Sequence, residues 1–265
     1  MMKANFLQPI LALALNTYRE SVRSKILYLA IFFCFFLIVV SSLFAKVSVG
    51  DAAQTVKDFG LASCSIFAVA FAVISGAMLL NKELLRKTIY NILSKPVMRW
   101  QFVFGKYLGM LLTVGLLILL MTAGLYLYLY LVFAQLDPLI WYGSFFIFLE
   151  LVILCAVAMF FSALVVTPVL SGIFTFSIFI AGRSVSYLTQ YFSQQNLNEP
   201  LEAVIQMLYW TLPRLDNLNL INAVVFENFE ILSFDRFFFS CLYAISYALV
   251  MLMLAAYFFK KREFN

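Results

Sequence analysis

The sequence predicts an all-α polytopic membrane protein with six transmembrane helices. Hydrophobic residues make up 65% of the chain and charged residues only 12%, and the mean hydropathy is +0.99. Soluble domains carry about 25% charged residues. The apolar residues also gather in runs of about 20, the length that crosses the hydrocarbon core of a bilayer as a helix. The 265 residues therefore form a single transmembrane domain, 1–265, without a large soluble part.

Residues 1–25 are predicted to form an amphipathic helix that lies in the membrane interface. Leu11, Leu15, Tyr18 and Val22 recur at the spacing of one helical face. Polar and basic residues fill the opposite face. A basic amphipathic helix next to a membrane span lies in the plane of the interface.

Six apolar runs follow this leader and predict the spans. They are 26–45, 59–80, 107–133, 139–161, 164–182 and 237–259. The sequence Gln135-Leu-Asp-Pro138 is typical of a turn between the third and fourth spans. Pro168 fits the first turns of the fifth span, where its missing N–H is tolerated.

The region 183–236 is the longest stretch outside the predicted spans. It holds two apolar stretches, 201–212 and 218–226, which are both too short to cross a bilayer. They are predicted to form either a re-entrant hairpin or two helices on the outer surface. The re-entrant alternative requires that protein or water covers any non-helical backbone at membrane depth.

The charge distribution predicts the orientation. With six spans, both ends of the chain lie on one side of the membrane, together with the segment 81–106. These parts hold most of the 18 Lys and Arg residues. Because Lys and Arg are retained in cytoplasmic loops, the termini and 81–106 are predicted to be cytoplasmic and 183–236 to be outside.

The segment 81–106 is the only long polar stretch between two spans on the basic side. Its apolar residues share one helical face, formed by Leu85, Ile89, Ile92 and Leu93, and Lys95-Pro96 ends the predicted helix. A short helix with an apolar ridge and a basic rim suits docking into the groove of a partner protein. The alternative is a solvated basic loop that only fixes the topology.

This segment resembles the loop between spans two and three of the type-2 ABC exporter permeases. That family commonly shows an acid, then Gly-Thr, Leu-Leu, Pro, Arg and Gly-Lys. The matching residues here are Glu83, Thr88-Ile89, Leu93-Ser94-Lys95-Pro96-Val97, Arg99, Gly105-Lys106 and Gly109, and Lys87 stands where Gly is usual. The order of leader helix, six spans and long outer loop also resembles this family.

The resemblance implies a permease of the bacterial cytoplasmic (inner) membrane that forms a homodimer or heterodimer. It further implies two copies of a separate cytoplasmic ABC ATPase, which would bind the ATP and Mg, so no cofactor is expected on this chain. The contacts with the ATPase are assigned to Glu83, Arg86, Lys87, Thr88, Ile89, Ile92, Leu93, Lys95, Pro96 and Arg99. Membrane lipid is a further expected partner, nucleic acid is not, and accessory proteins on the outer side stay open.

Four residues that are not among the assigned ATPase contacts are further candidates. Glu150 is the one acid inside a predicted span, where an isolated charge costs about 2.5–3.5 kcal/mol. It is either a pathway or substrate contact or an interhelical hydrogen-bonding group. Arg183, predicted at the outer mouth of span five, either meets an anionic group or extends to the interface. Gly105 and Gly109 form a small-x3-small ridge, which is typical of helix packing.

The composition gives little support to enzymatic function. The chain has no histidine, so the usual general base and the usual metal ligand are missing, and no catalytic or metal site is predicted. The phosphate-binding sequence G-x-x-x-x-G-K-[ST] is also absent, so ATP hydrolysis is assigned to the partner. The alternatives to an ATP-driven exporter are a stand-alone channel or secondary transporter, and an ABC mechanotransmission subunit without a translocated substrate. The substrate itself stays open.

Overall fold

The computed structural model describes residues 7–45, 51–85, 98–165, 167–193, 206–207, 209–225 and 234–261, which form helices and short connections without a strand. The helices are α1 (Leu7–Val22), α2 (Lys25–Ala45), α3 (Ala52–Leu85), α5 (Arg99–Phe133), α6 (Leu139–Leu164), α7 (Pro168–Ser193), the 3-10 turn η1 (Asp216–Leu218), α9 (Ile221–Val225) and α10 (Phe234–Lys261). Five of the described helices are long and apolar enough to cross a membrane. Helices α1 and α2, which are bent by 57° at their junction, count as a sixth span if the bent pair crosses the membrane together. The predicted all-α polytopic class is confirmed.

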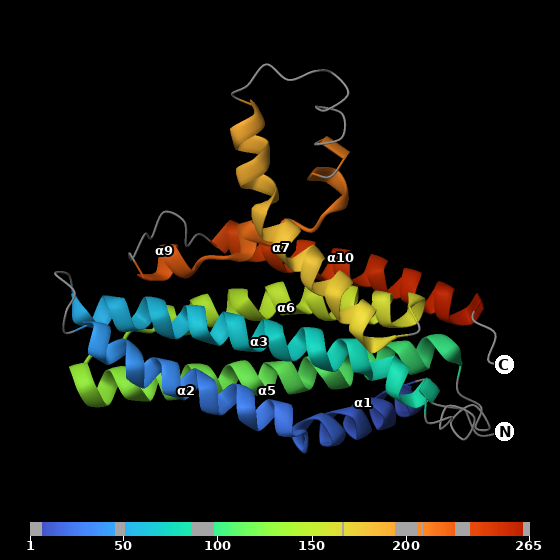
Figure 1. The fold of residues 1–265 in the computed structure, drawn as a ribbon, viewed down its shortest axis with the longest axis horizontal. Helices are drawn as coiled ribbons and strands as arrows, with labels where there is room; N and C mark the ends of the chain where they lie inside the picture. The colour runs from blue at the N-terminus through green and yellow to red at the C-terminus, as the bar shows by residue number, and fades with distance from the viewer. Residues whose placement is uncertain are drawn as a thin grey trace.

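The long helices α2, α3, α5, α6 and α10 run side by side, and the start of α1 and the end of α10 lie at the same end of the bundle (Figure 1). We call this the termini end and the opposite one the far end. Helix α6 is the centre of the bundle. In its most apolar stretch of 18 residues 78% is buried, compared with 17% in the corresponding stretch of α10. Small residues allow this central position: a Cβ on Gly76 of α3 would lie only 2.5 Å from the Cβ of Ala158 in α6.

Helix α1 packs in a way that its sequence pattern does not predict. Leu11 and Leu15 of the predicted apolar face are 56% and 50% exposed, whereas Ala14 and Thr17 are buried. The buried residues contact α5. The smaller side chains thus pack against protein, and the leucines lie on the outside, where lipid can cover them.

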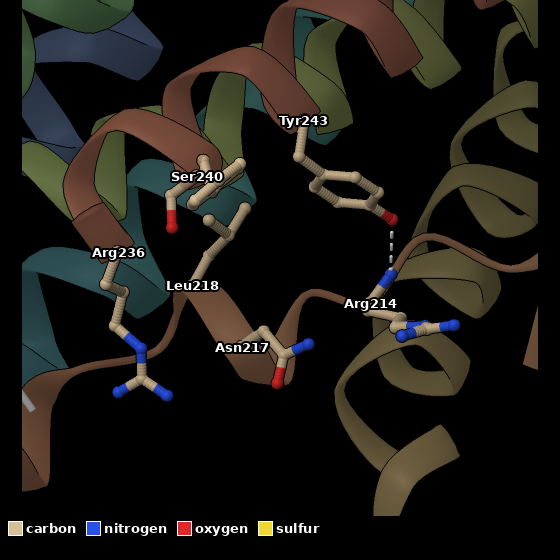
Figure 2. A pocket seen from close by; sticks show the side chains of 7 residues that line it. Arg214, Asn217, Leu218, Arg236, Ser240 and Tyr243 are labelled. Carbon is tan, nitrogen blue, oxygen red and sulfur yellow. Dashed lines mark hydrogen bonds between the residues drawn. The ribbon is translucent and has the colours of Figure 1, made fainter.

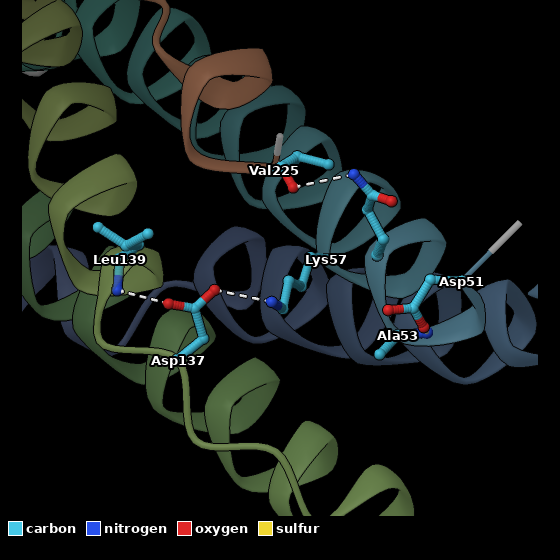
Figure 3. Close-up of polar contacts among 7 residues, drawn as sticks. Asp51, Ala53, Lys57, Asp137, Leu139 and Val225 are labelled. Atoms are coloured by element: carbon cyan, nitrogen blue, oxygen red, sulfur yellow. Dashed lines mark hydrogen bonds and ion pairs between the residues drawn. The ribbon is translucent and has the colours of Figure 1, made fainter. Parts of the chain in front are cut away.

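Two aspartates organise the far end of the bundle (Figure 3). Asp51 Oδ1 accepts a hydrogen bond of 3.0 Å from the Ala53 N–H at the start of α3. Asp137 Oδ1 accepts one of 2.9 Å from the Leu139 N–H at the start of α6, while its Oδ2 lies 2.7 Å from the Lys57 Nζ. Lys57 is neutralised by this contact, and α3 begins at Ala52, before the predicted start of the second span at 59.

Helix α7 continues beyond the predicted end of the fifth span at residue 182. Its last part projects to one side of the bundle, next to the short helical pieces 206–207 and 209–211 (Figure 1). We call 184–193, 206–207 and 209–212 the lateral arm. The chain returns to the base of this arm, where the Leu215 N–H donates a hydrogen bond of 3.1 Å to the Gly182 carbonyl. A Cβ on Gly182 would lie 2.5 Å from the Pro213 carbonyl oxygen, so glycine permits this close approach.

The second of the two short apolar stretches, predicted at 218–226, packs against the bundle. Leu218, Val224 and Val225 are buried, and α9 contacts both α3 and α6. The Gln54 side chain donates a hydrogen bond of 3.1 Å to the Val225 carbonyl and so fixes α9 to α3 (Figure 3). The first stretch, 201–212, belongs to the lateral arm where it is described.

Candidate functional site

Most of the predicted ATPase-docking residues lie outside the described part of the chain. Residues 86–97 fall between α3 and α5, and the side chains of 81–85 are likewise not described. The assignments of Glu83, of Arg86, Lys87, Thr88, Ile89, Ile92, Leu93, Lys95 and Pro96 therefore remain predictions. Helices α3 and α5 border the segment on its two sides.

Arg99, the last of the predicted docking residues, connects the start of α5 to the end of α10. Its Nη1 donates a hydrogen bond of 2.7 Å to the Lys260 carbonyl. A cation is favourable beside the carbonyl groups at a helix C-terminus. One turn further on, the ring of Phe102 stacks on that of Phe259 at 5.8 Å. The end of the docking segment is thus anchored to the C-terminal helix.

The structure places the Gly105–Gly109 ridge against α1. A Cβ on Gly105 would lie 2.7 Å from the Leu13 Cβ, and one on Gly109 would lie 2.5 Å from the Ala14 carbonyl oxygen. Neither contact leaves room for a larger residue. The leader helix therefore packs on the first turns of α5, next to the predicted docking segment.

Glu150 and Arg183 form a buried ion pair. The Arg183 Nε lies 2.7 Å from the Glu150 Oε1, and its Nη2 lies 2.8 Å from the Oε2. This two-pronged geometry is the strong form of an arginine–carboxylate contact. The same Nη2 donates a hydrogen bond of 2.8 Å to the Ser65 Oγ. The pair thus joins α6, α7 and α3.

The two residues meet because they lie at the same depth on adjacent antiparallel helices. Glu150 precedes the end of α6 by about 14 residues and Arg183 follows the start of α7 by about 15, so each lies roughly 21–23 Å from the connection at 1.5 Å per residue. Sequence reasoning named both residues but separated them, because the predicted span ended at Gly182. Arg183 lies inside α7, near the end of its apolar part Pro168–Tyr187, and its predicted place at the outer mouth of the span stays a prediction.

The burial of the pair is asymmetric. The Glu150 side chain is fully buried, whereas 25% of the Arg183 side chain is exposed. The guanidinium also lies 5.0 Å from the ring centroid of Phe179. Since a carboxylate in an apolar core needs a counter-charge, Arg183 provides the partner that lets Glu150 stay at this depth. The pair fixes α7 at the residue after which the lateral arm begins.

The described residues also hold a second ion pair, Lys57–Asp137, at the far end of the bundle. No group of three or more His, Cys, Asp or Glu side chains among them could hold a metal ion. Cys34 and Cys64 are both buried with their Sγ atoms 3.7 Å apart, and Cys155 is buried alone.

One family model matches the chain, whereas no curated protein matches it. The model of the family described as "ABC-2 family transporter protein" matches residues 11–264, which is nearly the whole sequence. Members of this family are multi-pass membrane subunits that generally pair with a cytoplasmic ABC ATPase and are generally not catalytic themselves. The chain belongs to the ABC-2 transporter family and has the role of an ABC permease.

Proposed function

We propose that this chain is the permease subunit of an ATP-driven exporter, and that two permease copies act with two cytoplasmic ATPase subunits. The observation that carries the proposal is the family match over residues 11–264 of a multi-helix membrane protein. Both termini and the segment 81–106 face the cytoplasm in this proposal, and the membrane is the bacterial inner membrane.

The helices around the docking segment support a route for coupling. Helix α3 runs for 34 residues up to it, and α5 runs for 35 residues away from it. A continuous helix transmits a displacement at one end along its whole length. The start of α5 is also fixed to α10 through Arg99 and to α1 through Gly105 and Gly109. ATP-driven movement of the docking segment would therefore move four helices together.

The lateral arm supports the presence of a second copy. It leaves the bundle near the depth of the Glu150–Arg183 pair and exposes large apolar side chains, with Tyr187, Met207 and Trp210 at 72%, 72% and 78%. Large exposed apolar side chains that lie together are typical of protein–protein or membrane contacts. A second permease copy that packs against the arm would cover them.

The test is co-purification of the ATPase from detergent, identified by mass spectrometry. The wild-type chain should carry a stoichiometric subunit with a phosphate-binding loop. The variant Arg86→Glu, Lys87→Glu, Leu93→Asp should lose it, because both the basic rim and the apolar ridge are removed. Arg23→Glu, Lys25→Glu is the matched control, since it reverses two exposed charges at the junction of α1 and α2, outside the docking segment.

Two results would contradict the proposal. A wild-type preparation without an ATPase would favour a stand-alone channel or carrier. An ATPase that stays bound to the triple variant, with its activity intact, would show that the segment 81–106 is not the docking site.

A further inference from the structure

The C-terminal end of α10 presents a basic surface. Lys260 and Lys261 occupy its last turn, and both are exposed. The last six residues of the sequence, KKREFN, hold three basic residues and one acid. The basic residues near the start of α10 are arranged differently: Arg236 and Arg214 line one cavity, but their guanidinium groups point away from each other (Figure 2). Two adjacent, exposed cations therefore distinguish the end of this helix from its start.

The charges of these two lysines are available to a partner. Among the described residues no acid forms an ion pair with either of them. The Lys261 Nζ lies 4.6 Å from the ring centroid of Tyr257, one turn earlier. An aromatic ring attracts a cation without neutralising it. The end of α10 therefore favours a partner that carries negative charge.

Aromatic contacts hold this end of α10 against two neighbouring helices. The ring of Phe259 stacks on that of Phe102 in α5 at 5.8 Å, with 18° between the ring planes, and both side chains are buried. The ring of Phe258 meets that of Phe160 in α6 edge to face at 5.9 Å. Because the backbone here is already fixed, a partner that binds the lysines has to order only their side chains.

The helix is long enough to carry the lysines out of the hydrocarbon core. The ring of Phe237 packs on those of Tyr142 and Phe145 at 6.2 and 5.0 Å, which aligns the start of α10 with the start of α6. Lys260 follows Phe237 by 23 residues, or about 35 Å of helix. The hydrocarbon core is about 30 Å thick. Both lysines therefore lie at the membrane surface on the side of the termini end.

This surface is continuous with the predicted docking segment. The Arg99 Nη1 donates a hydrogen bond of 2.7 Å to the Lys260 carbonyl, so the last assigned ATPase contact touches the first of the two lysines. Met98 and Trp100, on both sides of Arg99 in the sequence, are exposed. Aromatic, Met and Arg side chains are enriched in protein–protein interfaces. A subunit that covers the docking segment as far as Arg99 would therefore reach the end of α10.

We propose that the end of α10 is a second contact surface for the cytoplasmic ATPase, with Lys260 and Lys261 meeting acidic residues of that subunit. The proposal rests on the permease function proposed above. Anionic lipid headgroups also attract lysines at a membrane surface. The contact with Arg99 favours the ATPase, because it joins the lysines to the segment on which the ATPase docks. Movement of the ATPase would then act directly on α10 as well as on α3 and α5.

The first test is photo-crosslinking in the native cells, with the full chain carrying the photoreactive residue p-benzoylphenylalanine. At position 261 it should link to a protein that mass spectrometry identifies by its phosphate-binding loop. Met253 is the control position, because it is exposed on the same helix about two turns earlier, within the membrane span, and should not link to this protein. Ile92, in the docking segment, reports on the proposed function itself.

The second test measures the affinity of the purified permease for the ATPase. Lys260→Glu, Lys261→Glu should weaken binding about tenfold, because like charges then face each other across the interface. The loss should shrink at about 1 M salt, where the Debye length is about 3 Å. Lys260→Arg, Lys261→Arg keeps the charge and should bind like the wild type. Arg23→Glu, Lys25→Glu, the same reversal at the junction of α1 and α2, should leave the affinity unchanged.

The outcomes separate this proposal from the permease function. Linkage of the ATPase at position 92 but not at 261 would overturn the second contact surface and leave the permease function intact. Linkage to lipid alone at 261 would assign the lysines to the membrane surface. An unchanged affinity of the glutamate variant would also refute the proposal. Absence of an ATPase product at both positions would overturn the permease function together with it.

Discussion

Removing one member of the Glu150–Arg183 pair should destabilise the fold far more than removing both. Loss of one partner of a buried ion pair costs about 3–5 kcal/mol, because the other charge is left without compensation. Arg183→Leu leaves the fully buried carboxylate of Glu150 without its counter-charge. Glu150→Leu leaves the guanidinium of Arg183, whose side chain is 25% exposed, without its counter-charge. We therefore expect about 4–5 kcal/mol for Arg183→Leu and about 3 kcal/mol for Glu150→Leu.

The double variant gives the sharper result. Apolar residues of similar volume often replace a buried ion pair at little cost. Glu150→Leu, Arg183→Leu should therefore lie within about 2 kcal/mol of the wild type, and the coupling free energy of the cycle should exceed about 3 kcal/mol. The free energy of unfolding is measured by titration with sodium dodecyl sulfate in mixed micelles, followed by far-ultraviolet circular dichroism.

A neutral hydrogen bond between two helices provides the control. The Thr122 Oγ1 donates to the Ser144 Oγ at 2.7 Å. Ser144→Ala should cost about 0.6 kcal/mol, the average for such bonds in a membrane protein. If the two single leucine variants were no worse than this control and their effects were additive, the pair would not hold α7 against α6 and α3.

Three further predictions concern the packing of the bundle. Gly109→Leu should displace α1 and cost about 3 kcal/mol in the same titration, whereas Gly115→Leu, whose Cβ would be 3.5 Å from its nearest neighbour, should cost less than about 1 kcal/mol; equal losses would argue against the close contact with α1. Mild oxidation should link Cys34 to Cys64 within one chain, since their Sγ atoms are 3.7 Å apart, and peptide mapping that finds neither residue linked would contradict the α2–α3 packing. Asp137→Ala should cost about 3 kcal/mol because it removes both an ion pair and a helix cap, and Asp137→Asn, which keeps the cap, should recover about 1 kcal/mol; identical losses would exclude the capping role.

The sequence predicts the all-α polytopic class of this protein because hydropathy and helix length are local properties, and five to six apolar helices are present among the described residues. It fails where a charge interrupts an apolar run. Lys57 lies just before the predicted start of the second span at 59 and Arg183 just after the predicted end of the fifth at 182, yet both lie within helices. Their counter-charges, Asp137 and Glu150, are 80 and 33 residues away in the chain. A local window counts such a residue as an unpaired charge, whereas the folded protein neutralises it.

The candidate site was predictable in its members but not in its arrangement. Glu150 attracts attention because an intramembrane acid is expensive, and Arg183 because it borders a span. Their pairing depends on the register of α6 against α7, which follows from the short connection between them and not from either residue. Similarly, the spacing of Gly105 and Gly109 predicts a close helix contact but does not identify α1 as the partner.

The distribution of polar groups points to one functional side of the bundle. The pair of Glu150 and Arg183 fixes the base of the lateral arm, and the chain returns to that base at Gly182. A helix surface that faces only lipid has no use for unpaired arginines below the interface, since each of them costs free energy there. Both arginines of this side have protein contacts: Arg183 is paired with Glu150, and the Arg214 guanidinium lies over the rings of Tyr209 and Trp210 in the lateral arm. The cations on this side therefore connect the arm to the bundle, and a movement of α7 against α6 has to break or carry these contacts.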